Sequence, residues 1–276
     1  MAMIIPSQSF CFVKVPKTAG SSIEAYLSRF ISDFYISSPQ GPVAEMDKIV
    51  RGGVPSLGYK QVVYTSTGDF VRKLVTGWMK APQQIRLLYQ IYKTDSTREK
   101  IDTAIRLAQS QAKVHSHMTL GELESFIDKR FPDLDFSYHG FIRNPYDHAF
   151  SHFAYLLSKT QDPTVIPVDE LVKKFRQFVS TIYKPQKYWL LSDQSTCEIY
   201  KFENLEEEAQ RLRNLVVAET ETTVPADSEN RFPRLLENRY KSVFKPLKHH
   251  LLDNESRELI SRICRWEFEN YYPHSI

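Results

Sequence analysis

The segment PKTAGSS, residues 16–22, gathers a lysine, a glycine and three hydroxyl side chains within seven positions. It follows the apolar, β-prone run 10–15 and precedes residues 21–30, where apolar side chains recur at helical spacing. A strand that turns into a helix through small residues leaves several backbone N–H groups pointing at one spot, with the helix dipole behind them. The segment therefore predicts a binding site for a phosphate or a similar anion.

The order of residues in this segment differs from that of the familiar ATP-binding loop. Gly20 lets the backbone approach an anion closely, and the hydroxyls of Thr18, Ser21 and Ser22 can add donors. The ATP-binding version reads G-x-x-x-x-G-K-S/T, with its lysine at the helix start. Here Lys17 comes first and the leading glycine is missing. We therefore expect the ammonium on the other side of the bound phosphate.

A second group of polar residues lies in HGFIRNPYDHAFSHF, residues 139–153. A predicted strand ends just before Arg143 and Pro145 opens a helix, so the arginine falls at the carboxyl edge of the sheet, where α/β folds bind ligands. Ser151 follows eight residues later, about two helical turns along. Arginine suits bidentate binding of phosphate. On its own, Arg143 could equally pair with a carboxylate such as Asp147.

The alternation of strands and helices favours an α/β fold: a P-loop-like parallel β-sheet of about four to five strands, flanked by helices. The predicted strands are residues 10–15, 59–64, 136–142 and 198–202. Residues 70–113 carry three amphipathic helical patterns and predict a helical insertion, which suits a lid or a homodimer surface, with a plain outer layer as the alternative. Residues 36–55 read as a loop and 251–272 as one amphipathic helix. We expect a single domain over residues 1–276.

The composition is that of an ordinary soluble globular protein. Hydrophobic residues make up 42% and charged residues 25%, and the formal charge of +3 is too small to indicate nucleic acid as a partner. No stretch approaches the ~20 apolar residues of a membrane span, and no signal peptide is recognisable. Neither a C-x-x-C pair nor an Asp/His cluster suggests a metal or a disulfide framework. These features favour a cytoplasmic protein, or a lumenal one if the chain is a trimmed piece of a longer protein.

Together, PKTAGSS and RNPYDHAFS resemble the 5′-phosphosulfate loop and the 3′-phosphate motif of sulfotransferases that use 3′-phosphoadenosine 5′-phosphosulfate (PAPS). The loop is most similar to the carbohydrate and bacterial branches of that family. Weaker similarity continues in HSHMTLGEL, in the PQ of KPQKYWL, in EIYKFENLEEE and in WEFENYYP, and so touches most of the chain. The resemblance implies transfer of a sulfuryl group from PAPS to a hydroxyl of a glycan or a small molecule, without a metal.

The resemblance also implies roles for the donor-binding residues. Lys17 would contact the bridging oxygen of the sulfate and assist the departing phosphate. The 5′-phosphate would be held by Thr18, Ala19, Gly20, Ser21 and Ser22. Arg143 and Ser151 would hold the 3′-phosphate.

Two further features of the family concern the nucleotide. A second arginine commonly follows five residues after the first, and this chain has His148 there, which puts an auxiliary contact in doubt. A late basic segment commonly closes over the nucleotide, and the candidate is RYKSVFK, with Arg239, Lys241 and Lys245.

The acceptor hydroxyl needs a base, and histidine is suited to that role near neutral pH. The run KVHSHMT, residues 113–119, resembles the H-x-H segment of uronyl 2-O-sulfotransferases, whose second histidine is the base; His117 matches it. A histidine buried by a backbone hydrogen bond is the structural alternative, and His115 is the second candidate. Other members of the family use a glutamate, for which Glu24 or Glu45 would serve.

Two rival functions remain compatible with these residues. One is a P-loop-type kinase of a small hydroxyl compound, against which the position of Lys17 and the lack of a clear metal-binding aspartate count. The other is a non-catalytic nucleotide- or glycan-binding protein on the same scaffold. Simple binding needs neither a lysine at the bridging oxygen nor a base, so catalysis is the favoured interpretation.

Overall fold

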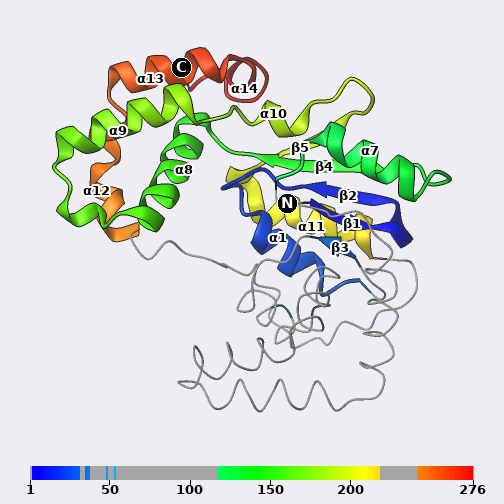
Figure 1. The fold of residues 1–276 in the computed structure, drawn as a ribbon. Helices are drawn as coiled ribbons and strands as arrows, with labels where there is room; N and C mark the ends of the chain where they lie inside the picture. Colours follow the sequence, from blue (N-terminus) through cyan, green and yellow to red (C-terminus); the bar gives the residue numbers. More distant parts are fainter. Residues whose placement is uncertain are drawn as a thin grey trace, which may run out of the picture.

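The computed structural model describes residues 2–31, 35–37, 48, 53, 117–217 and 241–275 (Figure 1). Several predictions fall outside these residues. They are the strand at 59–64, the helical insertion at 70–113, and the candidate residues Glu45, His115 and Arg239.

In the described part of the chain, five strands form one mixed sheet in the order β3-β1-β2-β4-β5. Their bounds are β1 Ala2–Ile5, β2 Phe10–Val13, β3 Ile36–Ser37, β4 Ser137–Ile142 and β5 Cys197–Lys201. Strands β2, β4 and β5 run parallel to one another, whereas β1 and β3 are antiparallel to their neighbours. The α/β fold with parallel strands and flanking helices is thus confirmed.

One edge of the sheet differs from the parallel strands: β1, which was not predicted, is antiparallel to β2 and to β3. Only the short turn around η1, Pro6–Gln8, separates β1 from β2. A parallel pair needs a crossover of a dozen or more residues, so a turn this short forces an antiparallel hairpin. Ser9 closes the turn with a φ of 47° and a hydrogen bond from its N–H to the carbonyl of Pro6. Residues 36–37, predicted as loop, form β3 beside β1.

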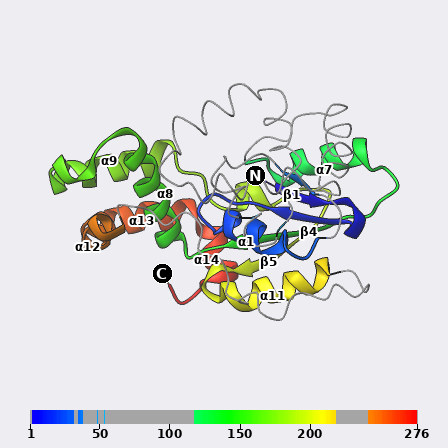
Figure 2. The same ribbon diagram turned by 90° about the horizontal axis from the view of Figure 1, so that it is seen from below.

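Helices cover both faces of the sheet and extend beyond its carboxyl edge (Figure 1, Figure 2). Their bounds are α1 Gly20–Leu27, α7 Leu120–Arg130, α8 Pro145–Thr160, α9 Val168–Thr181, α10 Lys187–Leu190, α11 Leu205–Val216, α12 Lys241–Leu251, α13 Asn254–Ile263 and α14 Arg265–Tyr271. In Figure 2, α7 and α11 lie on opposite sides of the sheet. Helices α8, α9, α12 and α13 form a separate group past the ends of the parallel strands. None of the described helices is long and apolar enough to cross a membrane.

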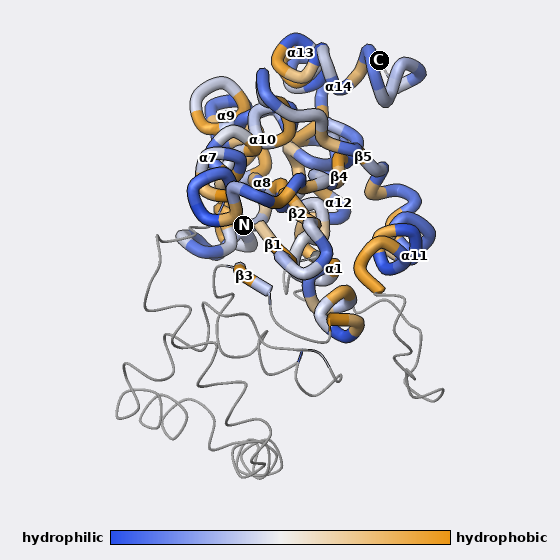
Figure 3. The backbone as a smooth tube through the Cα atoms, turned by 90° about the vertical axis from the view of Figure 1, so that its right-hand side faces the viewer, coloured by the Kyte–Doolittle hydropathy of each residue, from blue (hydrophilic) through white to orange (hydrophobic). Residues whose placement is uncertain are grey.

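The core consists of two layers, because alternate strand residues point to opposite faces. In β2, Cys11 and Val13 belong to the layer beneath α7 and α8, while Phe10 and Phe12 belong to the layer beneath α1 and α11. All four side chains are almost completely buried, as expected for a strand covered on both sides. Helix α11 shows hydrophobic and hydrophilic residues alternating around its axis (Figure 3), as a helix with one face on the sheet requires.

The predicted single helix at 251–272 is also wrong, because the chain turns twice within it. Helix α12 ends at Leu251, and Asp253 caps a new helix, α13, by accepting a hydrogen bond from the backbone N–H of Ser256. Cys264, with a φ of −100° and ψ of 27°, then separates α13 from α14. The hydrophobic period alone does not reveal these turns, since all three helices bury residues in the same core layer.

A substitution in β4 tests this packing. A Cβ atom on Gly140 would lie 2.4 Å from Cδ2 of the fully buried Leu190 and 3.4 Å from Sγ of Cys197. We predict that Gly140→Ala lowers the free energy of unfolding in urea by about 1–3 kcal/mol. Gly121→Ala is the control, because a Cβ there meets nothing nearer than 4.0 Å and the site is exposed in α7. Equal stability losses in the two variants would contradict the described packing.

Candidate active site

The loop between β2 and α1 lies at the carboxyl edge of the parallel strands. Lys17 and Ala19 both have left-handed backbones, with φ values of 64° and 60°. Such values are uncommon for residues other than glycine and cost of order 1 kcal/mol each. Ala19 is the N-cap of α1 and offers no side-chain acceptor to the first amides of the helix, and the first turn contains no acidic residue. This geometry leaves the positive end of α1 facing the loop, as an anion site requires.

The small residues of the loop divide into buried and partly accessible ones. Thr18 is fully buried and its hydroxyl donates a hydrogen bond to the carbonyl of Val15, 3.0 Å away. Its hydroxyl proton is therefore used within the loop, and only its backbone can serve an anion. A Cβ on Gly20 would lie 3.1 Å from the side chain of Lys14, so any larger residue would require that side chain to shift. Ser21 is half-buried, and Ser22 is buried in the first turn of α1.

Glu24, one of the alternative bases, is engaged beneath the loop. Its carboxylate is fully buried, forms ion pairs with Lys14 and Lys48, and accepts a hydrogen bond of 2.9 Å from the hydroxyl of Tyr35. The distance from its Oε1 to Nζ of Lys48 is 2.7 Å. A carboxylate held between two ammonium groups is a poor proton acceptor. We assign Glu24 to fastening α1 onto the strand that leads into the loop.

Arg143 is held through its backbone by a single side chain. Its N–H donates to Oε1 of Gln186 at 2.8 Å, and Nε2 of Gln186 donates to the Arg143 carbonyl at 2.7 Å. Gln186 is fully buried, so its side chain is held in a fixed position beside the Arg143 backbone. The guanidinium lies over the ring of Phe202, 4.6 Å from its centroid. In the sequence, the PQ pair that contains Gln186 is only a similarity to the family. No local pattern connects Gln186 to Arg143, because the two residues are 43 positions apart.

The residue after Arg143 is held from the C-terminal part of the chain. The backbone N–H of Asn144 donates to Glu203 at 2.9 Å, and the hydroxyl of Tyr272 donates to the other oxygen of that carboxylate at 2.7 Å. Glu267 accepts a hydrogen bond of 2.8 Å from the N–H of Lys187, next to Gln186. The segments EIYKFENLEEE and WEFENYYP thus position the end of β4.

One face of α8 lines the lysine loop. His148, His152, Tyr155 and Lys159 recur along α8 at helical spacing. Nζ of Lys17 lies 4.3 Å from the centroid of the Tyr155 ring, and Nζ of Lys159 lies 4.2 Å from the same centroid. Ser151 adjoins this face and is half-buried. The helix that begins after Arg143 therefore also reaches Lys17, and brings the two sequence motifs together.

The electrostatics of this region favour an anion. Burial, with the charges of Arg143 and Lys159 nearby, lowers the pKa of Lys17 to about 8. Burial also lowers the pKa of Arg143, although Asp147, Glu203 and Tyr272 oppose this. Among the described residues, no carboxylate forms an ion pair with any of these three cations. Lys17 and Arg143 are partly buried, and partly buried cations without an ion-pair partner are stabilised by a bound anion.

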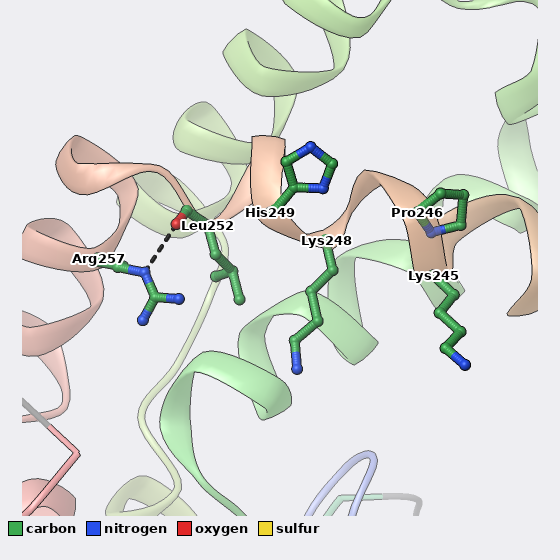
Figure 4. A pocket seen from close by; sticks show the side chains of 6 residues that line it. All are labelled: Lys245, Pro246, Lys248, His249, Leu252 and Arg257. Carbon is green, nitrogen blue, oxygen red and sulfur yellow. Dashed lines mark hydrogen bonds between the residues drawn. The ribbon is translucent and has the colours of Figure 1, made fainter.

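The remaining predicted residues lie on other elements. His117 is exposed, has a φ of 67°, and lies two residues before the α7 cap, where Thr119 and Glu122 form a capping box. Lys241 is the first residue of α12, but its side chain lies outside the described part of the chain. Lys245 lines a pocket with Pro246, Lys248, His249, Leu252 and Arg257 (Figure 4).

The basic helix α12 is attached to the first turn of α8. Lys248 forms an ion pair with Asp147, four residues after Arg143. In Figure 4, Lys245 and Lys248 point to the same side of α12. Helix α12, which contains residues 241–245 of the late basic segment, is thus connected to the helix that follows Arg143, and Asp147 pairs with Lys248 instead of Arg143.

Comparison with known proteins identifies the class to which this site belongs. A model of the sulfotransferase family matches residues 1–273. Neither the search of curated proteins nor that of solved structures gave a significant match. The chain therefore belongs to the sulfotransferase family, whose members transfer a sulfuryl group.

Because the pKa of Lys17 is lowered in the folded protein, the free energy of unfolding should depend on pH through this residue. Below about pH 8 the folded protein carries a partly buried ammonium whose unfolded pKa is 10.5, so folding is penalised in full. Between about pH 8 and pH 10.5 the folded lysine is neutral while the unfolded one is still charged. The penalty on folding therefore decreases steadily as the pH rises through this range. We predict that Lys17→Met is more stable than wild type by about 1 kcal/mol at pH 7, and that the difference fades towards pH 10.5.

The measurement is urea unfolding of both proteins across this pH range. Lys173→Met, at an exposed position of α9, is the matched control and should show neither the gain nor the trend. A Lys17→Met protein that is less stable than wild type at pH 7 would contradict the electrostatic description of the loop.

Proposed function

We propose that this sulfotransferase takes its sulfuryl group from PAPS and transfers it in line to a hydroxyl of a glycan or a small metabolite. The observation that supports this donor is the pair of separate cations, Lys17 and Arg143, with neither of which a described carboxylate forms an ion pair. PAPS carries an anionic group at each end of its ribose, and so matches two cationic positions at one sheet edge. ATP, whose phosphates form a single chain, needs only one.

The loop would hold the 5′ side of the donor. The backbone of Thr18, Ala19 and Gly20, with Ser21 and Ser22, lies at the N-terminal, positive end of α1. Arg143 and Ser151 would hold the 3′-phosphate from the start and the second turn of α8. Lys241, at the start of α12, would close over the nucleotide.

The proposed chemistry is a displacement at sulfur. The acceptor oxygen forms a bond to sulfur as the bond from sulfur to the bridging oxygen breaks, and adenosine 3′,5′-bisphosphate leaves. His117 takes the proton of the acceptor hydroxyl. Lys17 donates a hydrogen bond to the bridging oxygen and meets the charge that develops there. With a pKa of about 8, its ammonium is predominantly charged at neutral pH yet gives up a proton more readily than an ordinary lysine.

Binding measurements distinguish this donor from that of a kinase. By calorimetry, wild-type protein should bind adenosine 3′,5′-bisphosphate at least about 10-fold more tightly than ATP or adenosine 5′-phosphate. Arg143→Gln should weaken binding of the bisphosphate by about 10- to 100-fold, because a charge-assisted contact to the 3′-phosphate is lost. It should leave adenosine 5′-phosphosulfate, which lacks that phosphate, unaffected.

Arg262→Gln, at an exposed position of α13, is the matched control and should bind all these ligands like wild type. Tighter binding of ATP than of the bisphosphate would favour the kinase alternative. If Arg143→Gln lost affinity equally for the bisphosphate and for adenosine 5′-phosphosulfate, Arg143 would not be the residue that binds the 3′-phosphate.

Turnover measurements test the catalytic roles. An acceptor screen with labelled PAPS, covering glycans, phenols and aliphatic alcohols, supplies the assay. With the best acceptor, Lys17→Ala and His117→Ala should each lower kcat by about 100-fold or more while circular dichroism stays unchanged. His274→Ala, exposed near the C-terminus, is the control. Near-normal turnover of Lys17→Ala would refute the proposed function, and an unchanged rate in His117→Ala would move the base to His115 or Glu45.

A further inference from the structure

His148 lies in α8, five residues after Arg143, and is completely buried. Its Nε2 is 2.7 Å from the carbonyl oxygen of Pro16, and its Nδ1 is 2.8 Å from the hydroxyl of Tyr183. A carbonyl oxygen can only accept, so Nε2 carries the ring proton and donates it to Pro16. In the neutral ring Nδ1 is then an acceptor, and the hydroxyl of Tyr183 donates to it.

The surroundings of His148 keep this arrangement neutral. Burial lowers its pKa to about 3, and the nearby His152, Arg143 and Lys17 act in the same direction, although the bond to Pro16 opposes them. Both ring nitrogens are occupied by protein partners and no part of the side chain reaches solvent. A residue that bound a phosphate would instead need a free donor at the surface of the site.

Tyr183 is itself held in place. It follows α9, and its backbone N–H donates to the carbonyl of Phe178 at 2.9 Å. Cys264, buried between α13 and α14, donates its thiol to the Tyr183 hydroxyl at 3.6 Å. The ring of Tyr183 also packs against His148, with centroids 5.5 Å apart. The imidazole is thus fixed by Tyr183, which is itself held by the end of α9 and by Cys264.

The accepting carbonyl is significant because of its place in the loop. The carbonyl of Pro16 and the N–H of Lys17 belong to one planar peptide unit. A hydrogen bond to this carbonyl fixes the orientation of that plane, and therefore the left-handed φ of 64° that Lys17 adopts. The direction in which the lysine side chain leaves the loop depends on this dihedral angle.

We propose that His148 is a positioning residue that holds Lys17 in its working orientation through the Pro16 carbonyl, and that it does not bind the 3′-phosphate. The inference rests on the proposed function only in taking Lys17 as the catalytic lysine. A charged side chain at position 148 could not hold the Pro16 carbonyl in the same buried surroundings, whereas a neutral imidazole can.

Three substitutions separate positioning from phosphate binding. His148→Gln can keep both a donor for Pro16 and an acceptor for Tyr183, and should retain kcat within about 3-fold. His148→Leu removes the donor and should lower kcat by about 10- to 100-fold, while KM for PAPS and binding of adenosine 3′,5′-bisphosphate change by less than about 3-fold. His148→Arg should lower the thermal stability and should not strengthen binding of the bisphosphate, because it buries a charge without a partner.

His139 provides the matched control. It is also buried and bonded to a tyrosine, with 3.0 Å between its Nδ1 and the hydroxyl of Tyr200, but it lies in β4 before the strand reaches the site. His139→Leu should lose stability without a change in kcat per folded molecule. A drop in kcat equal to that of His148→Leu would show that any buried histidine has this effect, and would contradict the specific role.

A spectroscopic measurement keeps the inference testable even if His148→Leu fails to fold. In wild-type protein, two-bond ¹H–¹⁵N NMR correlations should show the Nε2–H tautomer of His148, with no titration between about pH 5 and 8. An Nδ1–H tautomer, a ring that titrates, or weaker bisphosphate binding by His148→Leu at unchanged kcat would overturn it. Failure of the wild-type protein to bind the bisphosphate would instead contradict the proposed function.

Discussion

The arrangement of the site depends on one electrostatic constraint: the charges of Lys17, Arg143 and Lys159 act on one another, and no described carboxylate forms an ion pair with any of them. Like charges in a partly buried region repel, so the folded protein must hold their backbones firmly. It does so with uncharged supports. The imidazole of His148 fixes the peptide before Lys17, and the amide of Gln186 binds both backbone groups of Arg143. Neither support adds a charge that would compete with a bound anion.

Both supports depend on the C-terminal helices. Cys264 bonds to Tyr183, which orients His148, and Glu267 bonds to the residue that follows Gln186. Tyr272 completes the set by bonding to Glu203, which holds the N–H of Asn144. These residues are far from the loop in sequence, yet each is linked to the backbone beside a cation of the site through two or three contacts. The C-terminal helices are therefore part of the architecture of the site.

The parts of the fold and the site that could be predicted are those determined by residues that are contiguous in the sequence. A strand, a small-residue loop and a helix identify the anion site around Lys17, and a strand followed by Arg143 and a proline identifies the second cation. The parts that could not be predicted depend on contacts across the chain. Gln186 meets Arg143 across 43 positions and His148 meets Pro16 across 132, and nothing local signals either. The burial of Glu24 between two lysines and the antiparallel edge of the sheet are of the same kind.

The central claim is that the ammonium of Lys17, which has no anionic partner among the described residues, gains one when the 5′ end of the donor binds. The most direct test is an NMR titration of the Lys17 side chain in protein labelled with ¹³C-lysine, with and without adenosine 3′,5′-bisphosphate. The pKa of Lys17 should be about 8 in the free protein and rise by at least about one unit in the complex, because a nearby phosphate favours the charged form. A bisphosphate that binds and leaves the pKa of Lys17 unchanged would contradict the claim.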